Sequence, residues 1–223
     1  MKYDFRFDYI WQQLPDLLEG LLLTLQVSLL SIVLAICVGL LGAIFRLASV
    51  PILSQLTAAY VSLIRNTPLL VQLFFIFYGL SSIGLGLSLY WSGVVCLVVW
   101  GGAYNVENIR GGFKSIPEGL LEASMALGLK KIHYILLVAI PLGMRVAIPA
   151  SLNTSVSVLK NSAFLQVIGL TELTFVAMDR IAEDFRTLEM LAAIGVIYFV
   201  LVLILSASVR QLESRMNRPF RTS

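Results

Sequence analysis

Long uncharged stretches alternate with short charged segments along the whole chain, and the first such stretch covers residues 21–45. It holds 25 residues without a charge and is followed by Arg46. A helix needs about 20 apolar residues to cross a hydrocarbon core about 30 Å thick. The apolar part of a cleaved signal peptide is only about 7–15 residues long. The pattern therefore predicts a first membrane span here.

The second uncharged stretch, residues 66–106, contains 41 residues. As one helix it would be about 61 Å long, which is too long for a single span. The glycine-rich segment 79–88 is the natural break. We therefore expect a second span that begins between Leu53 and Tyr60 and ends near Leu80, and a third span over residues 89–109.

The last third of the chain has a less regular pattern. Only 14 uncharged residues separate Arg145 from Lys160, and Pro149 lies among them. We expect a fourth span there that is interrupted or carries a charge. Residues 171–189 mix acidic and basic residues and predict short surface helices, whereas 190–209 supply twenty uncharged residues for a fifth span. The predicted fold is an all-α integral membrane protein with five transmembrane helices.

Composition supports a membrane protein and excludes several kinds of chemistry. Hydrophobic residues make up 58% of the chain and charged residues 13%, against about 45–50% and about 25% in soluble domains. Cys37 and Cys96 lie in apolar runs, which favours small buried side chains over a disulfide or a metal site. The single histidine, His133, argues against a histidine-based metal or proton-relay site. We predict no metal site and no catalytic residues.

The distribution of basic residues predicts the orientation, because cytoplasmic segments carry an excess of lysine and arginine. With five spans, eleven basic residues fall on one side and four on the other. The predicted topology places the N-terminus outside and the C-terminus in the cytoplasm. Residues 1–16 form a periplasmic amphipathic segment, 17–212 the transmembrane domain, and 213–223 a basic cytoplasmic tail.

The predicted cytoplasmic stretch 115–141 has the pattern of two short helices. Ser115 and Glu118 have the spacing of a capping box, with Pro117 in the first helical turn. Gly128 stands where a left-handed C-cap is needed. The second helix begins after Lys130 and runs to Pro141.

The same stretch offers a docking surface for a partner. Small residues at Ala123 and Ser124 allow another surface to approach the helix closely, and Glu122 offers a carboxylate to a basic groove. The alternative is an amphipathic helix pair that lies on anionic lipid through Lys130 and Lys131.

Several residues of this stretch resemble the EAA loop of bacterial ABC-importer permeases. The match consists of Glu122-Ala123-Ser124, then Gly128, and then Val138, Ile140 and Pro141, with Ser124 in place of the usual third alanine. The resemblance implies that the loop couples the permease to an ATPase. The residues implied in coupling are Glu122, Ala123, Ser124, Gly128, Lys130 and Pro141.

Two further segments resemble the polar-amino-acid subfamily of these permeases, of the histidine, glutamine and glutamate type. One runs from Arg65 to Phe75 and has Asn66 where the subfamily usually has glycine; the other covers residues 103–112. Glu107 and Arg110 lie three residues apart on one helix face and are expected to pair. The motif and gating residues implied are Arg65, Thr67, Pro68, Gln72, Glu107 and Arg110.

A third segment, Lys160-Asn161-Ser162-Ala163, resembles the subfamily's lysine–aspartate–threonine–serine element. Lys160 would lie about 22 Å deeper than Arg145, where a lysine costs about 2.5–3.5 kcal/mol on insertion scales. We interpret Lys160, Asn161 and Ser162 as lining the substrate path. Asn161 cannot neutralise Lys160 as aspartate would, which favours an acidic, glutamate-like or aspartate-like substrate. The alternative is a lysine that snorkels to the outer interface or pairs with Glu172 or Glu189.

The chain lacks a G-x-x-x-x-G-K-[ST] phosphate loop and any Ser-His-Asp or Cys-His set. It is therefore predicted to be no enzyme and to hold no cofactor, with ATP and Mg²⁺ bound by a separate ATPase chain.

The resemblance extends over almost the whole chain and implies a complete importer. It implies a five-helix type I ABC importer (MetI-like) core in the bacterial inner membrane, paired with a second permease copy or a paralogue. The other implied partners are an ATPase dimer, a periplasmic or lipid-anchored amino-acid-binding protein and membrane lipid, with no nucleic acid. Transport would proceed by alternating access. Alternatives are an ATP-independent secondary transporter or channel, an intramembrane enzyme, and an assembly subunit without a substrate site.

Overall fold

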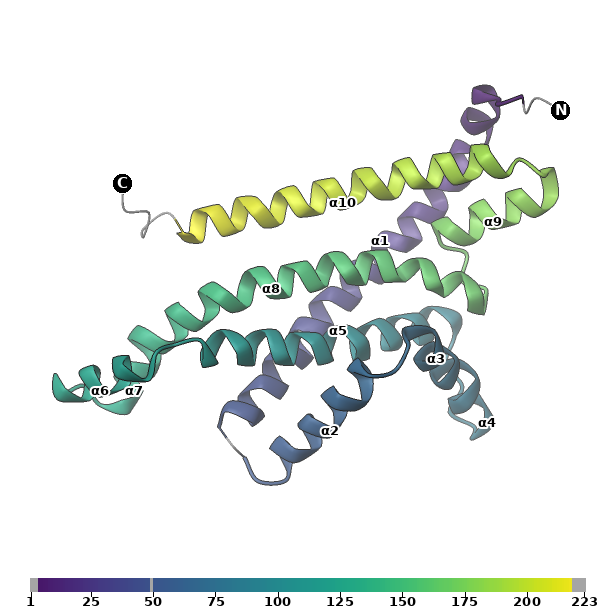
Figure 1. Cartoon of the computed structure of the whole chain (residues 1–223). Helices are drawn as coiled ribbons and strands as arrows, with labels where there is room; N and C mark the ends of the chain where they lie inside the picture. The colour runs from purple at the N-terminus through teal and green to yellow at the C-terminus, as the bar shows by residue number, and fades with distance from the viewer. Residues whose placement is uncertain (1–3, 49, 218–223) are drawn as a thin grey trace. The chain divides into compact units, whose positions relative to one another are not determined.

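The structure, a computed structural model, describes residues 4–48 and 50–217, and every regular element in these ranges is helical. Residues 1–3 of the predicted N-terminal segment and 218–223 of the predicted tail lie outside the described residues. Figure 1 shows the helices in chain order. Residues 7–16 belong to the first long helix, so the amphipathic segment and the first span form one element.

Four helical stretches are long and apolar enough to cross a membrane. They are α1 (Phe7–Leu47), α5 (Leu89–Lys114), the continuous stretch Lys131–Ile168, and α10 (Thr187–Asn217), whose portion Thr187–Gln211 qualifies. A fifth span is present if the pair formed by α2 (Leu53–Arg65) and Leu69–Ser82 is counted as one. The latter comprises α3 (Leu69–Phe74), a π-helical turn (Phe75–Gly79) and α4 (Leu80–Ser82). These elements correspond to the five predicted spans.

The second span is broken rather than continuous. The helix stops at Arg65, and Pro68 adopts an extended conformation (φ −64°, ψ 138°) before α3 begins. Proline lacks an N–H and disfavours helical backbone in the residue before it. The side-chain amide of Gln72 donates to the carbonyl and hydroxyl oxygens of Thr67, at 3.1 and 2.9 Å, and so holds the turn closed.

The fourth span is continuous and carries the charge of Lys160, which is the second of the two forms that we expected. The helix does not end at Pro141, where we had expected an end. The stretch Lys131–Ile168 comprises α7 (Lys131–Tyr134), a π-helical turn (Ile135–Ala139), α8 (Ile140–Asn161) and a 3₁₀ segment (Ser162–Ile168). A proline ring collides with the carbonyl four residues earlier, which for Pro141 is that of Leu137 in the π turn. The wider π turn accommodates this collision, because its hydrogen bonds span five residues rather than four.

The chain divides into two compact units, and the four long helices contribute residues to both. In the first unit (1–33, 67–98 and 156–206), α9 (Leu173–Asp184) packs its Leu173 and Ala177 with Leu17 of α1 and Met190 of α10. Figure 1 shows α9 next to the end of α10 at which that helix begins. The predicted short surface helix is thus present, with one face buried.

The second unit (34–66, 99–155 and 207–223) is packed around small residues. Ala43 and Ala147 form a buried cluster with Ile109. A Cβ added to Gly39 would lie 2.3 Å from the Cβ of Asn105, so α1 and α5 approach closely here. Such contacts between small residues are typical of helix packing in membranes.

Candidate coupling surface and substrate path

The predicted cytoplasmic stretch contains α6 (Glu118–Ala126) and α7, but the predicted capping box does not form. Pro117 is the N-cap residue in an extended conformation, with no side-chain cap bond. The Ser115 hydroxyl instead donates to the carbonyl of Gly112 at 2.8 Å. Ser115 therefore completes the end of α5 and does not start α6.

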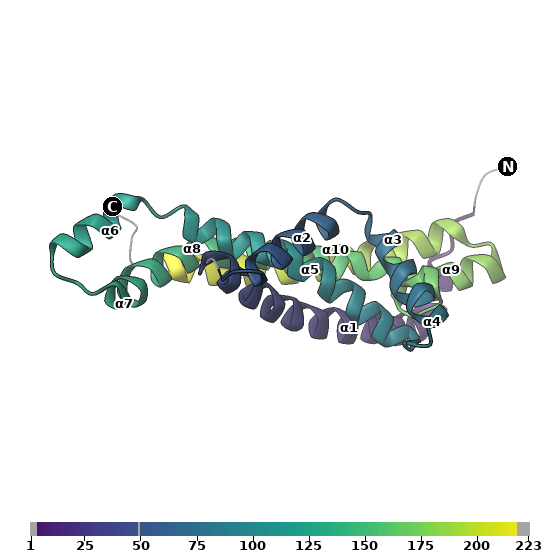
Figure 2. The same ribbon diagram turned by 90° about the horizontal axis from the view of Figure 1, so that it is seen from below.

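Gly128 forms the turn between the two helices, as its position predicted. Its φ is 77°, in the left-handed region that a side chain with a Cβ disfavours. Its N–H donates to Met125, and the N–H of Leu129 donates to Ser124, which closes the end of α6. Figure 2 shows the chain reversing between α6 and α7. We call residues 115–134 the elbow.

The elbow exposes a mixed apolar and charged surface. Glu122, Ala123, Lys130 and Lys131 are exposed, whereas Ser124 is buried and donates its hydroxyl to the carbonyl of Leu120 at 2.6 Å. Large apolar side chains are exposed beside them: Leu127 is 82% exposed, and Met125 and Ile132 about half. An exposed apolar patch with a charged rim marks an interaction surface.

The two helices that carry the elbow, α5 and α8, contact each other closely at its base. A Cβ added to Gly112 of α5 would lie 2.5 Å from the carbonyl oxygen of Gly143 in α8, and 2.9 Å from the Ala147 nitrogen. A Cβ on Gly143 would meet the Phe113 ring at 2.9 Å. The two helices that carry the elbow are therefore fixed to each other by backbone contact.

The residues of the second and third spans form local contacts. The Arg65 guanidinium lies 5.0 Å from the centre of the Tyr104 ring, which also packs on Trp100. The predicted pairing of Glu107 with Arg110 is confirmed, since Arg110 Nε donates to Glu107 Oε1 at 2.9 Å.

Lys160 lies on the wall of a cavity of about 340 Å³, together with Ala163, Tyr198 and Phe199. Its side chain is exposed and makes no ion pair within the described part of the chain. Asn161 is half-buried and does not line this cavity. Ser162 is buried and donates to the carbonyl of Leu159 at 2.7 Å. Of the three predicted path residues, only Lys160 faces the cavity.

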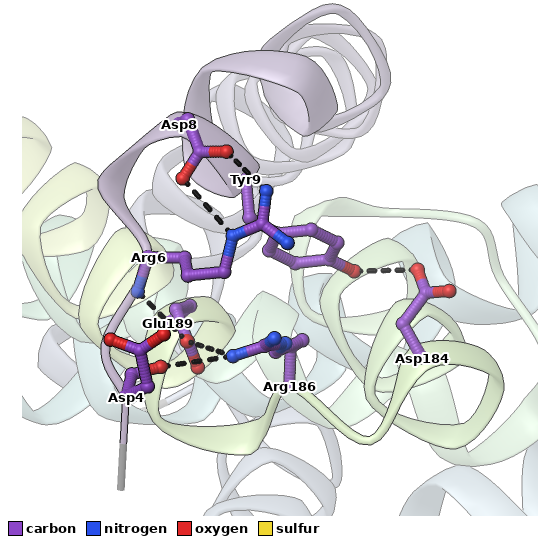
Figure 3. A network of polar contacts seen from close by, with 7 residues as sticks. All are labelled: Asp4, Arg6, Asp8, Tyr9, Asp184, Arg186 and Glu189. Atoms are coloured by element: carbon purple, nitrogen blue, oxygen red, sulfur yellow. Dashed lines mark hydrogen bonds and ion pairs between the residues drawn. The ribbon is translucent and has the colours of Figure 1, made fainter.

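The proposed alternative partners of Lys160 are engaged elsewhere. Glu189 accepts bonds from the Arg6 backbone N–H at 3.2 Å and from the Arg186 side chain at 3.3 Å. Figure 3 shows this network, in which the Tyr9 hydroxyl also donates to Asp184 at 2.7 Å. Because Asp184 is the last residue of α9, this bond links that end of α9 to α1.

Glu172, which precedes α9, is fully buried. Its carboxylate accepts hydrogen bonds from the Phe175 N–H at 2.9 Å, the Tyr198 hydroxyl at 3.0 Å and the Thr24 hydroxyl at 3.3 Å. It thereby links the start of α9 to α1 and α10. Tyr198 bonds Glu172 and also lines the Lys160 cavity.

The sequence did not predict that Glu172 is buried and links three helices, because residues 171–189 have the composition of an exposed segment. The available signal was the polar atoms of Thr24 and Tyr198 inside otherwise apolar spans, since such atoms need a buried partner.

Glu172→Gln tests the protonation state of this carboxyl group. Burial raises the pKa of Glu172 above its ordinary range, against the hydrogen bonds that favour the charged form. A raised pKa means that the folded protein keeps this proton up to a higher pH than the unfolded chain does. The free energy of unfolding therefore falls as the pH rises from the pKa of the unfolded state through that of the folded state. We expect the Tm of the wild-type protein to fall relative to the glutamine variant between pH 5 and pH 8. An equal difference at both pH values would contradict a raised pKa.

Comparisons with known proteins agree with this architecture. The family described as "Binding-protein-dependent transport system inner membrane component" matches residues 32–218. The chain is 35% identical over 216 residues to the glutamine transport system permease protein GlnP of Escherichia coli K12, covering 95% of this chain and 99% of that protein.

Solved structures give the same result for the fold. The crystal structure of an amino acid ABC transporter with histidines matches with a TM-score of 0.89 and 32% identity, covering 96% of this chain and all of that one. An inward-facing MetNI methionine ABC transporter matches with a TM-score of 0.70 and 20% identity, covering 95% and 99%.

These matches define the class as the multi-pass membrane subunits of ABC transporters. The chain belongs to the family of binding-protein-dependent transport system inner membrane components, and it is an amino-acid ABC transporter permease with the MetI-like helical fold.

Proposed function

We propose that this chain is the membrane subunit of an ATP-driven importer and moves a polar amino acid into the cytoplasm by alternating access. The observation that carries the proposal is the elbow, which exposes apolar and charged residues around a glycine turn. It is carried by two membrane helices, α5 and α8, that are held together by close backbone contact. A partner that binds the elbow would move α5 and α8 together. Glu122, Ala123, Gly128 and Lys130 would contact the partner, while Ser124 and Pro141 would shape the helices beneath.

The proposed partners follow from the chemistry that the chain lacks. An ATPase dimer would bind ATP and Mg²⁺, a second permease copy or a paralogue would complete the path, and a binding protein would deliver the amino acid. The excess of basic residues around the elbow supports a cytoplasmic elbow and C-terminus, with α9 and the N-terminus outside. Conformational change would be a rigid-body movement of packed helices.

Co-purification of a tagged chain tests the ATPase dependence. We expect the ATPase to be recovered with the permease and transport in vesicles to require ATP. Transport without ATP on an ion gradient, with no ATPase recovered, would favour a secondary transporter.

For the substrate we propose an acidic amino acid. Lys160 is the observation that supports it, because its ammonium group makes no ion pair within the described residues and faces a cavity. The relatives show that the family handles several polar amino acids: the E. coli protein is named for glutamine and the solved transporter contains histidines. An uncompensated positive charge in such a cavity would favour a substrate carboxylate.

Lys160→Gln is expected to lower the uptake of glutamate or aspartate about tenfold while the complex still assembles, since one lost charge interaction is worth about 1–2 kcal/mol. Asn161→Asp should lower the preference for acidic over neutral amino acids, because the new carboxylate would neutralise Lys160. Lys114→Gln, at the end of α5, is the control for a general loss of positive charge. Unchanged acidic uptake in an assembled Lys160→Gln transporter would rule out this assignment.

A further inference from the structure

A cavity with a mainly apolar wall lies in the second unit, next to the elbow. Its volume is about 740 Å³, which is within the range of about 300–1,000 Å³ typical of ligand pockets. Three segments form it: the last turns of α1, the last turns of α5, and the chain from Lys131 to Met144. Small side chains, Ala43, Ala48 and Ala139, leave the space open.

The wall of the cavity is almost entirely apolar and carries a single charged residue. Eleven of the twelve lining residues are apolar, and the twelfth is Lys131. Lys131 is exposed and makes no ion pair within the described ranges. No lining residue is acidic. A ligand that fits this wall has a long apolar part and one anionic group beside Lys131.

The position of the cavity indicates the source of such a ligand. Arg46 and Lys114 lie in the last turns of α1 and α5, so the cavity is at the basic ends of two spans. At that level a membrane presents acyl chains beside headgroup phosphates, and basic pockets between helices at this surface bind anionic headgroups.

We propose that the cavity is a binding site for an anionic phospholipid, with an acyl chain between α1, α5 and α8 and its phosphate on Lys131. The π-helical turn Ile135–Ala139 supplies part of the wall, with Ile135 and Ala139. An occupied cavity would brace the helix that emerges from the elbow against α1. The site would therefore link the local lipid to the position of the elbow, and it is independent of which amino acid is transported.

Neighbouring lysines provide a matched test. Lys130 and Lys131 are both exposed, but only Lys131 lines the cavity. The purified transporter complex in mild detergent would be titrated with phosphatidylglycerol and, separately, with phosphatidylcholine, and bound lipid would be counted by native mass spectrometry. We expect a preference for phosphatidylglycerol that Lys131→Gln lowers roughly fivefold, the equivalent of about 1 kcal/mol for one basic residue at a membrane surface. Lys130→Gln should keep the preference.

Filling the cavity tests its apolar part. Ala139→Trp should reduce the binding of both lipids, whereas Leu137→Trp, exposed on the same π turn and outside the cavity wall, should not. Equal losses in Lys130→Gln and Lys131→Gln, or no preference for the anionic lipid, would overturn the proposal. Loss of the ATPase in Ala139→Trp with unchanged lipid binding would assign the cavity to the ATPase and would also overturn it.

Discussion

Replacing Gly128 with valine is expected to abolish coupled uptake while the permease still inserts into the membrane. A β-branched residue is a strong outlier at the φ of 77° found here, and such strained backbone costs about 1–3 kcal/mol. Nothing lies within 4 Å of the added Cβ, so the effect would come from the backbone and not from a steric clash. The turn would open, and the surface around Glu122 would lose its orientation relative to Lys130.

The measurements are ATP hydrolysis, amino-acid uptake and ATPase recovery on the same preparation. We expect either hydrolysis without uptake or loss of the ATPase. Gly84→Val is the matched control, because Gly84 has a φ of 82° and equally empty surroundings but lies in the turn after α4. It should cause similar backbone strain and leave coupling intact. Normal coupled uptake in Gly128→Val would show that this turn does not transmit the movement.

The membrane spans were predictable because a bilayer imposes a simple rule on the sequence. An uncharged run of sufficient length must be helical, since no water is available to satisfy the backbone. The rule does not locate helix ends, and α1 begins at Phe7, well before its uncharged run. Residues outside the hydrocarbon region are free to continue a helix that has already formed.

Local capping and proline patterns were less reliable, because each competes with a neighbouring interaction. Ser115 was expected to cap α6, but its hydroxyl reaches the Gly112 carbonyl at the end of α5. Pro141 was expected to end a helix, but the π turn before it absorbs the misfit. Pro68 does break its span, and a hydrogen bond from the side-chain amide of Gln72 to the Thr67 hydroxyl stabilises the turn.

Some features of the candidate sites could be predicted from the sequence and others could not. Gly128 was predictable because a left-handed turn has few alternatives to glycine. The position of Lys160 on a cavity wall could be expected from the cost of a lysine in a span. The Glu172 network and the cavity beside Lys131 could not, since each brings together residues from three separate helical segments.

Gly112→Val is expected to destabilise the base of the elbow, where it would place a Cβ 2.5 Å from the carbonyl oxygen of Gly143. Backbone cannot move aside as a flexible side chain does, so α5 and α8 must separate. Overpacking costs about 1–3 kcal/mol, occasionally more, and for a chain of this size each kcal/mol lowers the Tm by roughly 2–4 °C.

Gly111→Val is a close control, because the neighbouring residue has no atom within 4 Å of its added Cβ. Thermal unfolding in detergent should show a fall of roughly 2–12 °C for Gly112→Val and little change for Gly111→Val. Equal effects of the two substitutions would mean that the contact between Gly112 and Gly143 does not hold α5 and α8 together at the base of the elbow.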